Sequence, residues 1–233
     1  VAGLMNLQDY GIHIEEKFHR LNGHYWLNYI SKVFGFANLE HITSIKINEI
    51  GDYTSSDASV FNKYGIVLDL PAALIEILFG LKNINNIYYL KHFLSYFIFL
   101  ISSFFFFKIL IKRFDNLFIC FIGLLLYITT PRILGDSFLY KDVLFLSFFT
   151  ITIFFFLKSI EKLDVNNLIY FSLFSALSFN LRIFSILIPI FFLVILIIKN
   201  YSKNKYFHDY KKFTLYLFFL VFFTYIFWPY LWS

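Results

Sequence analysis

The chain has 233 residues, of which 59% are hydrophobic and 24% aromatic, and its mean hydropathy is +0.69. Its 35 phenylalanines are too many for one soluble core, so the composition excludes an ordinary soluble globular protein. The net charge of +5 is modest and the lysines fall between apolar runs, so no nucleic-acid-binding face is indicated. The single cysteine, Cys120, excludes an internal disulfide. We expect an all-α protein, a polytopic transmembrane helix bundle.

The most polar stretch comes first, at residues 9–20, with the sequence DYGIHIEEKFHR. Spaced as a helix, its polar residues share one face: Asp9, His13, Glu16 and Arg20. Its apolar residues share another: Tyr10, Ile14, Phe18 and Leu21. This pattern predicts an amphipathic helix at a surface. We expect it to lie on a membrane over a cavity walled by the later spans, where one of its carboxylates does chemistry.

Two other interpretations of this stretch stay open. It could be a solvated helix beside the membrane with routine ion pairs four residues apart, Glu16 with Arg20 and Glu15 with His19. A metal site is a weaker alternative. His13 and Glu16 lie one turn apart, but the second histidine of a metalloprotease-type helix is absent. A divalent metal is therefore an open possibility and no cofactor is assigned.

Residues 1–88 are expected to form a large first loop with interfacial helices. HYWLNYI at 24–30 carries the amphipathic aromatics that prefer the headgroup level, and residues 51–59 are a turn-rich linker. GIVLDLPAALIEILFG at 65–80 is apolar but too short to cross a membrane, and it carries Asp69 and Glu76. We expect it to be an interfacial or partly re-entrant helix with Pro71 in its first turn.

Residues 89–233 are expected to form a bundle of about six spans, with further spans before and after the given sequence. The apolar runs are 89–110, 117–131, 143–158, 167–181, 183–198 and 213–230. Residues 167–198 could instead form one long helix, which would leave Arg182 within the membrane. With two helices, the loops at 108–116, 158–166 and 199–212 share a side and hold ten Lys and Arg residues. The positive-inside rule favours two helices and makes that side cytoplasmic.

A second polar cluster, PRILGDSFLYKD at 131–142, then lies on the outer side with residues 1–88 and Arg182. It contains charges of both signs: Arg132, Asp136, Lys141 and Asp142. The loop could be polar only because it is exposed to water. Alternatively, Arg132, Lys141 and Arg182 could together bind a phosphate, since guanidinium forks and ammonium groups recognise phosphate oxygens.

This layout resembles the GT-C glycosyltransferases, in particular the bacterial set related to protein O-mannosyltransferases and the Rgt-type lipid-dependent transferases. The resemblance covers almost the whole chain as a pattern of hydropathy and scattered polar residues. It rests on Asp9 at the start of the first outer loop, LDLPAALIEILFG, YYLKHFLSYF, TTPRILGDSFLYKD and LSFNLRIFSILIPI. In the family the first-loop acid often belongs to an Asp-Glu pair, whereas Tyr10 follows Asp9 here.

The resemblance implies a transferase of the bacterial inner membrane with an extracytoplasmic active site. The donor would be a sugar on polyprenyl phosphate, and the acceptor a glycan, lipid or protein among the membrane lipids. Asp9 would be the base, alone or with Glu15 or Glu16, and Glu16 or His13 would orient it or the acceptor. The phosphate would be held by Arg132, Lys141 and Arg182, within the loop that also carries Asp136 and Asp142.

Two other functional classes remain. A transporter or flippase of lipid-linked intermediates would carry ionisable groups near mid-bilayer and internal repeats, and the spans after residue 92 show neither pattern. A non-catalytic membrane subunit would leave the two outer polar clusters without a reason to coincide. The distance between the acidic first loop and the later cations separates the enzyme from these alternatives.

Overall fold

The computed structural model describes residues 11–13, 15–51, 65–139, 142–201 and 206–232. It is 85% helical, with no strand in these ranges. The helices in chain order are α2 (Glu16–Val33), α3 (Ala37–Ile50), α4 (Asp69–Leu78), α5 (Ile84–Arg113), α6 (Leu117–Thr129), α7 (Pro131–Asp136), α8 (Asp142–Glu161), α9 (Val165–Leu181), η3 (Ile183–Ile186), α10 (Leu187–Tyr201), α11 (Tyr206–Phe227) and η4 (Pro229–Trp232).

Three helices are long and apolar enough to cross a membrane: α5, α8 and residues Tyr210–Phe227 of α11. α6 and the segment Ile183–Lys199 are apolar but shorter. These helices are compatible with a membrane location, because a helix of about 20 apolar residues spans a hydrocarbon core of about 30 Å. The chain is therefore an all-helical protein with three candidate membrane-spanning helices among the described residues.

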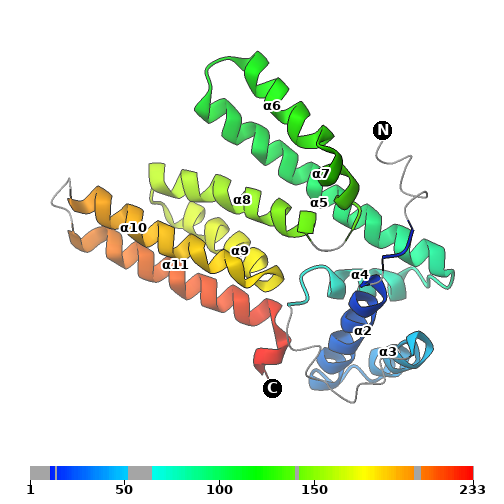
Figure 1. Cartoon of the computed structure of the whole chain (residues 1–233). Helices are drawn as coiled ribbons and strands as arrows, with labels where there is room; N and C mark the ends of the chain where they lie inside the picture. Colours follow the sequence, from blue (N-terminus) through cyan, green and yellow to red (C-terminus); the bar gives the residue numbers. More distant parts are fainter. Residues whose placement is uncertain (1–10, 14, 52–64, 140–141, 202–205, 233) are drawn as a thin grey trace.

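The prediction of two helices within residues 167–198 is confirmed. α9 ends at Leu181, and Arg182 is extended, with φ −148° and ψ 128°. A short 3₁₀ turn follows before α10, and Pro189 lies in the first turn of α10, where its missing N–H costs no helix hydrogen bond. Figure 1 shows α8, α9, α10 and α11 side by side, with α5 and α6 as a second pair and α2, α3 and α4 at one end.

Aromatic side chains fill the bundle of α8, α9, α10 and α11. Phe171 and Tyr216 are fully buried and stacked, with ring centroids 4.4 Å apart, and Phe192 meets both rings edge-on. Elsewhere large apolar side chains face outward, such as Phe118 on α6, which is 71% exposed. Buried and exposed phenylalanines of one chain are expected when the solvent is hydrocarbon, because the outer surface then gains nothing from polarity.

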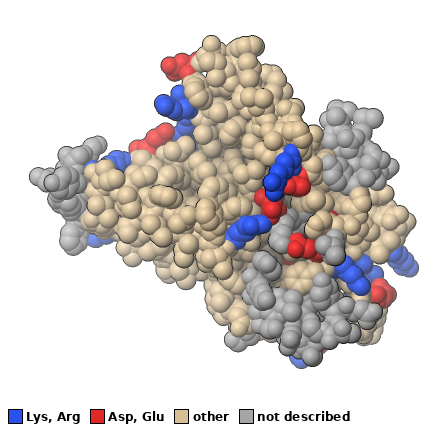
Figure 2. All heavy atoms as spheres, viewed as in Figure 1, with Lys and Arg blue, Asp and Glu red and all other residues tan. Residues whose placement is uncertain are grey.

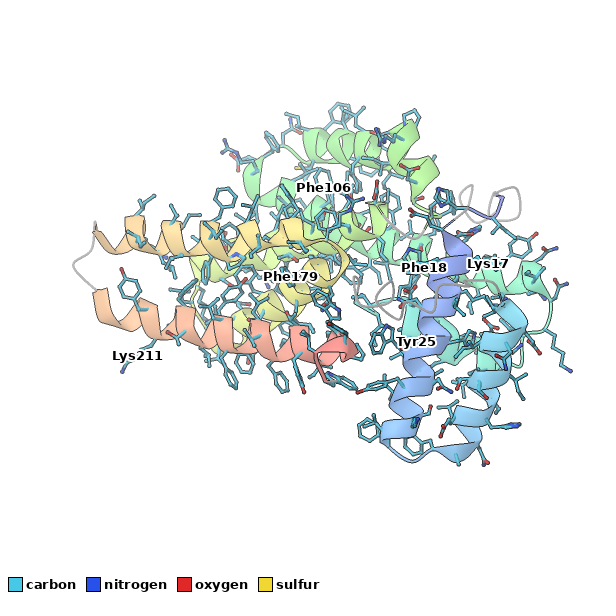
Figure 3. All side chains as sticks on the ribbon, turned by 60° about the horizontal axis from the view of Figure 1, so that its bottom comes forward. Lys17, Phe18, Tyr25, Phe106, Phe179 and Lys211 are labelled. Carbon is cyan, nitrogen blue, oxygen red and sulfur yellow. The ribbon has the colours of Figure 1, made fainter. Side chains whose placement is uncertain are left out.

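The two ends of the bundle differ in charge. At one end the loops that the sequence placed on a single side do meet: Lys112 lies 2.6 Å from Glu161, and Lys199 donates to the carbonyl of Ile160 at 2.6 Å. Lys212 donates to the carbonyl of Leu163 at the same end. Figure 3 shows Lys211 at this end of α11, whereas Phe179 on α9 lies toward α2.

The helix predicted from Asp9 onward is shorter than expected. α2 begins at Glu16, and Gly11, Ile12 and His13 are non-helical. The backbone N–H of His13 donates to Glu16 Oε2 at 3.1 Å, and that of Glu15 donates to His13 Nδ1 at 3.3 Å. These contacts use backbone donors just before the helix begins, whereas the N-cap residue Glu15 makes no side-chain capping hydrogen bond.

The prediction of α2 as a surface helix is also wrong. Its polar side chains Glu16 and Arg20 are buried against other helices, and Phe18 and Leu21 belong to a core with Trp26, Ile50 and Ile66. Trp26 is 3% exposed, so this aromatic is a core residue and not an interfacial anchor. Protein covers most of α2, because α3 and α4 pack on it, and Lys17 is on the part that stays exposed.

α4 carries the short apolar run and has Pro71 in its first turn, as predicted. Its acidic residues Asp69 and Glu76 are buried against α2 rather than exposed. Gly23 allows this approach, because a Cβ there would lie 2.3 Å from the carbonyl oxygen of Asp69. The close contact of α2 and α4 therefore depends on one residue without a side chain.

Candidate functional site

A polar pocket of about 280 Å³ lies where the bundle meets α2. It is lined by residues from three separate parts of the chain: His13, Glu15, Glu16, His19, Asp136, Leu139, Asp142 and Arg182. Figure 2 shows that the face in view is largely uncharged, with acidic and basic side chains gathered where the bundle meets the first helices and at the helix ends. The first polar stretch and the second polar cluster therefore meet in one hollow.

Each wall comes from the end of a helix. The first turn of α2 and the residues before it supply the histidine and glutamate side chains. The last residue of α7 is Asp136 and the first residue of α8 is Asp142, and the extended break between α9 and η3 supplies Arg182. Helix ends bring polar groups together here because loops join the apolar helices at this level.

Glu16 is held from two sides. Its Oε1 lies 2.7 Å from His92 Nε2 on α5, and its Oε2 accepts the backbone N–H of His13 at 3.1 Å. The side chains of Glu16 and His92 are 2% and 1% exposed. Lys91, also buried, donates to the backbone oxygen of Glu16 at 3.5 Å. The carboxylate is thus fixed on the pocket wall with little freedom.

The cations predicted to bind phosphate lie in different surroundings. Arg182 lines the pocket and donates to Asp142. The Arg132 side chain is 87% exposed and lies 3.8 Å from Asp136, outside the described pocket wall. Of the other predicted site residues, Asp9 and Lys141 lie outside the described residues. The structure therefore brings together His13, Glu16, Asp136, Asp142 and Arg182.

The described pocket wall carries more carboxylates than cationic side chains. Glu15, Glu16, Asp136 and Asp142 supply four carboxylates, and Arg182 supplies the one guanidinium among the described lining residues. Within the described ranges no group of three or more His, Cys, Asp or Glu side chains is placed to hold a metal ion. The arrangement is suited to accepting protons and hydrogen bonds from a hydroxyl-rich ligand, with one cation at the edge.

Behind the pocket lies a buried polar network that was not predicted from the sequence. Arg20 donates two hydrogen bonds to the Glu76 carboxylate, of 2.6 and 3.0 Å. Asp69 accepts from Asn22 at 2.6 Å and lies 3.2 Å from His19 Nδ1. The predicted partner of Glu16 was Arg20, but each pairs elsewhere, with His92 and Glu76.

A signal for this network exists in the sequence. Asp69 and Glu76 are seven residues apart, so they share one face of an apolar helix. Acidic groups on an apolar helix require a partner when they are buried. His24 supplies a further contact, 3.2 Å from Glu76. The spacing of Asp69 and Glu76 does not indicate which partner each carboxylate contacts.

The protonation of Glu76 reflects these contacts. Burial raises the pKa of its carboxyl, but the contacts with His24 and Arg20 lower it more, and the net pKa is about 2 against an ordinary 4.5. Glu76 is therefore ionised over the whole physiological range, and the Arg20–Glu76 pair is a permanent link between α2 and α4.

A second hollow is apolar. A groove of about 340 Å³ lies among α9, α10 and α11 and is lined mainly by aliphatic and aromatic side chains: Ser175, Phe179, Ser185, Ile186, Pro189, Leu217, Leu220, Val221, Thr224, Tyr225 and Leu231. The turn that carries Arg182 leads directly into η3, whose Ser185 and Ile186 form one wall of this groove. The polar pocket and the apolar groove thus share one turn.

Comparison of the chain with known proteins gives no match. No family model matches it, and neither any curated protein nor any solved structure is significantly similar to it.

Proposed function

We propose that the chain is an integral membrane glycosyltransferase, which moves a sugar from a polyprenyl-phosphate donor to an acceptor on the extracytoplasmic side. The acceptor is a glycan, a lipid or a protein. In this proposal the helices from α5 onward form a polytopic bundle, and α2, α3 and α4 cover its outer end. The observation that carries the proposal is the meeting of Glu16 with Asp136, Asp142 and Arg182 in one pocket at the end of apolar helices.

The distribution of charge supports the orientation. The described Lys and Arg residues of the loops at 108–116, 158–166 and 199–212 lie at the end opposite the pocket. Under the positive-inside rule that end faces the cytoplasm, and the pocket then opens outward. Nucleotide sugars are cytoplasmic, so a transferase that works outside draws its sugar from a carrier in the bilayer.

The chemistry assigned to the pocket is a single displacement. The bond between the sugar C1 and the donor phosphate oxygen breaks as the acceptor oxygen bonds to C1. The acceptor hydroxyl proton passes to a carboxylate, and we assign this role to Glu16 on the pocket wall. Asp9, which lies outside the described residues, is the alternative base. The polyprenyl phosphate leaves with the bonding electron pair, and Arg182 exchanges Asp142 for it.

The apolar groove supports a lipid-linked donor. It begins at the same turn as Arg182, so a head group at Arg182 places a hydrocarbon tail beside Ser185 and Ile186. The tail passes from lipid into the groove, so its binding there depends on van der Waals packing and not on removal from water.

The proposal is tested with the full chain in membranes supplied with labelled polyprenyl-phosphate sugars. Glu16→Gln removes the base with little change of shape, and we expect transfer to fall by about 100-fold or more. Glu161→Gln is the matched control, because Glu161 is exposed at the opposite end and pairs with Lys112. Asp9→Asn and Glu15→Gln identify whether a neighbouring carboxylate shares the role.

Unchanged transfer in all three acidic variants contradicts the assignment of the base to this stretch. Movement of the labelled lipid across the membrane without any glycosylated product supports the transporter instead.

A further inference from the structure

His92 lies outside the pocket but directly behind it. Among the described residues the pocket wall includes Glu16 and not His92. His92 Nε2 lies 2.7 Å from Glu16 Oε1, across 76 residues of sequence. Both side chains are almost fully buried, so no water competes for the contact.

The helix that carries His92 is a firm support. One turn further along α5, Tyr96 stacks on Phe138 with ring centroids 4.8 Å apart. Phe99 is fully buried in the same cluster. α5 also packs along α8, whose first residue is Asp142 of the pocket. The contact between Glu16 and His92 therefore ties Glu16 to a helix that is packed firmly against α8.

Two consecutive residues of α5 hold Glu16. Lys91 donates to its backbone oxygen at 3.5 Å, and His92 contacts its carboxylate. A carboxylate only accepts hydrogen bonds, so the tautomer that fits carries its proton on Nε2. The Nδ1 atom makes no hydrogen bond to any described residue, which is consistent with that tautomer.

We propose that His92 is a positioning residue, whose Nε2–H holds the Glu16 carboxylate at the angle and depth from which it accepts a proton in the pocket. The inference rests on the proposed function, since it assigns a task to Glu16. His92 itself touches no substrate. Its contribution is preorganisation, because a misplacement of about 1 Å in a catalytic group costs about 100-fold in rate.

Two amide substitutions test this without a change of charge. In His92→Gln the side-chain amide nitrogen reaches the place of Nε2 and keeps the donor, whereas the shorter amide of His92→Asn stops near Nδ1. We expect His92→Asn to lower kcat by about 100-fold with little change in KM, and His92→Gln to recover most of that loss. A merely structural histidine would not distinguish the two amides in this way.

His24→Asn is the control, because His24 is as fully buried as His92 but contacts Glu76 instead of Glu16. The proposal is overturned if the two His92 variants lose the same activity, if the loss lies in KM alone, or if His24→Asn reproduces it.

A second readout separates this inference from the proposed function. A water-soluble carbodiimide with an amine labels accessible carboxyl groups, and mass spectrometry reads the extent at Glu16, with exposed Asp142 as the internal reference. We expect labelling of Glu16 to rise severalfold in His92→Asn and little in His92→Gln. Equal labelling in both overturns the positioning role, whereas the expected labelling in a protein without transferase activity removes only the proposed function.

Discussion

The layer formed by α2, α3 and α4 (the α2–α4 layer) and the bundle of α8–α11 are stabilised by different kinds of contact. In the first, buried acids meet buried cations and histidines, as in the Arg20–Glu76 pair. In the second, aromatic rings fill the interior, as in the Phe171–Tyr216 stack. The difference follows from what each region must do. In the proposed membrane location, a bundle that faces hydrocarbon is stabilised by dense packing, whereas a layer that covers a polar pocket fixes its helices by directional contacts.

The contrast also predicts different responses to substitution. A buried ion pair is of uncertain net value when intact but costly when one partner is removed. An aromatic core loses stability in proportion to the cavity left behind. Four changes, from the largest expected effect to the smallest, distinguish these mechanisms.

Removal of one charge should have the largest effect. Arg20→Ala leaves Glu76 buried without its main partner, and we expect a loss of about 3–5 kcal/mol in the free energy of unfolding. The measurement is denaturant unfolding in detergent, with Lys17→Ala on the exposed side of α2 as the control. The double variant Arg20→Met/Glu76→Leu should recover most of this loss. If the double variant is as unstable as Arg20→Ala, packing and not charge is the cause.

A cavity in the bundle should cost nearly as much. Phe171 is fully buried between Tyr216 and Phe192, so Phe171→Ala should lower the free energy of unfolding by about 3–5 kcal/mol. The loss is nearer the lower value if the helices move together and fill part of the cavity. Phe218→Ala, at a side chain 64% exposed, is the matched control. Similar losses for both would show that the ring stack is not a core. Thermal unfolding followed by circular dichroism measures both.

Acid should weaken the α2–α4 layer but not the ring stack. The pKa of Glu76 is lowered from 4.5 to about 2, so the folded state binds this proton more weakly than the unfolded state. The stability that Glu76 contributes is complete above its unfolded pKa and is lost as the pH falls toward the folded value, to a total of roughly 3 kcal/mol.

Unfolding midpoints compared at about pH 5 and about pH 3 test this contribution. Wild type should lose more stability between them than Glu76→Gln, which has no carboxyl to protonate. Parallel curves would mean that other groups carry the acid response.

The smallest effect should come from one hydrogen bond inside the bundle. The Tyr216 hydroxyl donates to Ser175 at 3.2 Å with both groups buried. Tyr216→Phe keeps the stacked ring and removes only this bond, so we expect a loss of about 1 kcal/mol. Tyr170→Phe, at an exposed ring, should change nothing measurable. A loss as large as that of Phe171→Ala would instead show a polar contribution comparable with the packing.

Much of the helical pattern could be predicted from local sequence. The runs at 89–110, 143–158 and 167–181 lie within α5, α8 and α9, and the break near Arg182 follows from the charge count of the loops. α3 had no such signal, since its polar and apolar residues mix without a clear period. The pocket residues Glu16, Asp142 and Arg182 were likewise singled out as charges beside apolar runs.

By itself the sequence determined the membrane-like composition, the helical segments and the polar residues at their ends, because backbone hydrogen bonds within a helix depend on neighbours in the chain. Only the tertiary structure decided that α2 is buried, that Arg20 meets Glu76 and that His92 meets Glu16. Those partners lie 56 and 76 residues apart, and helix packing, not any local pattern, selects among the available partners for each acid.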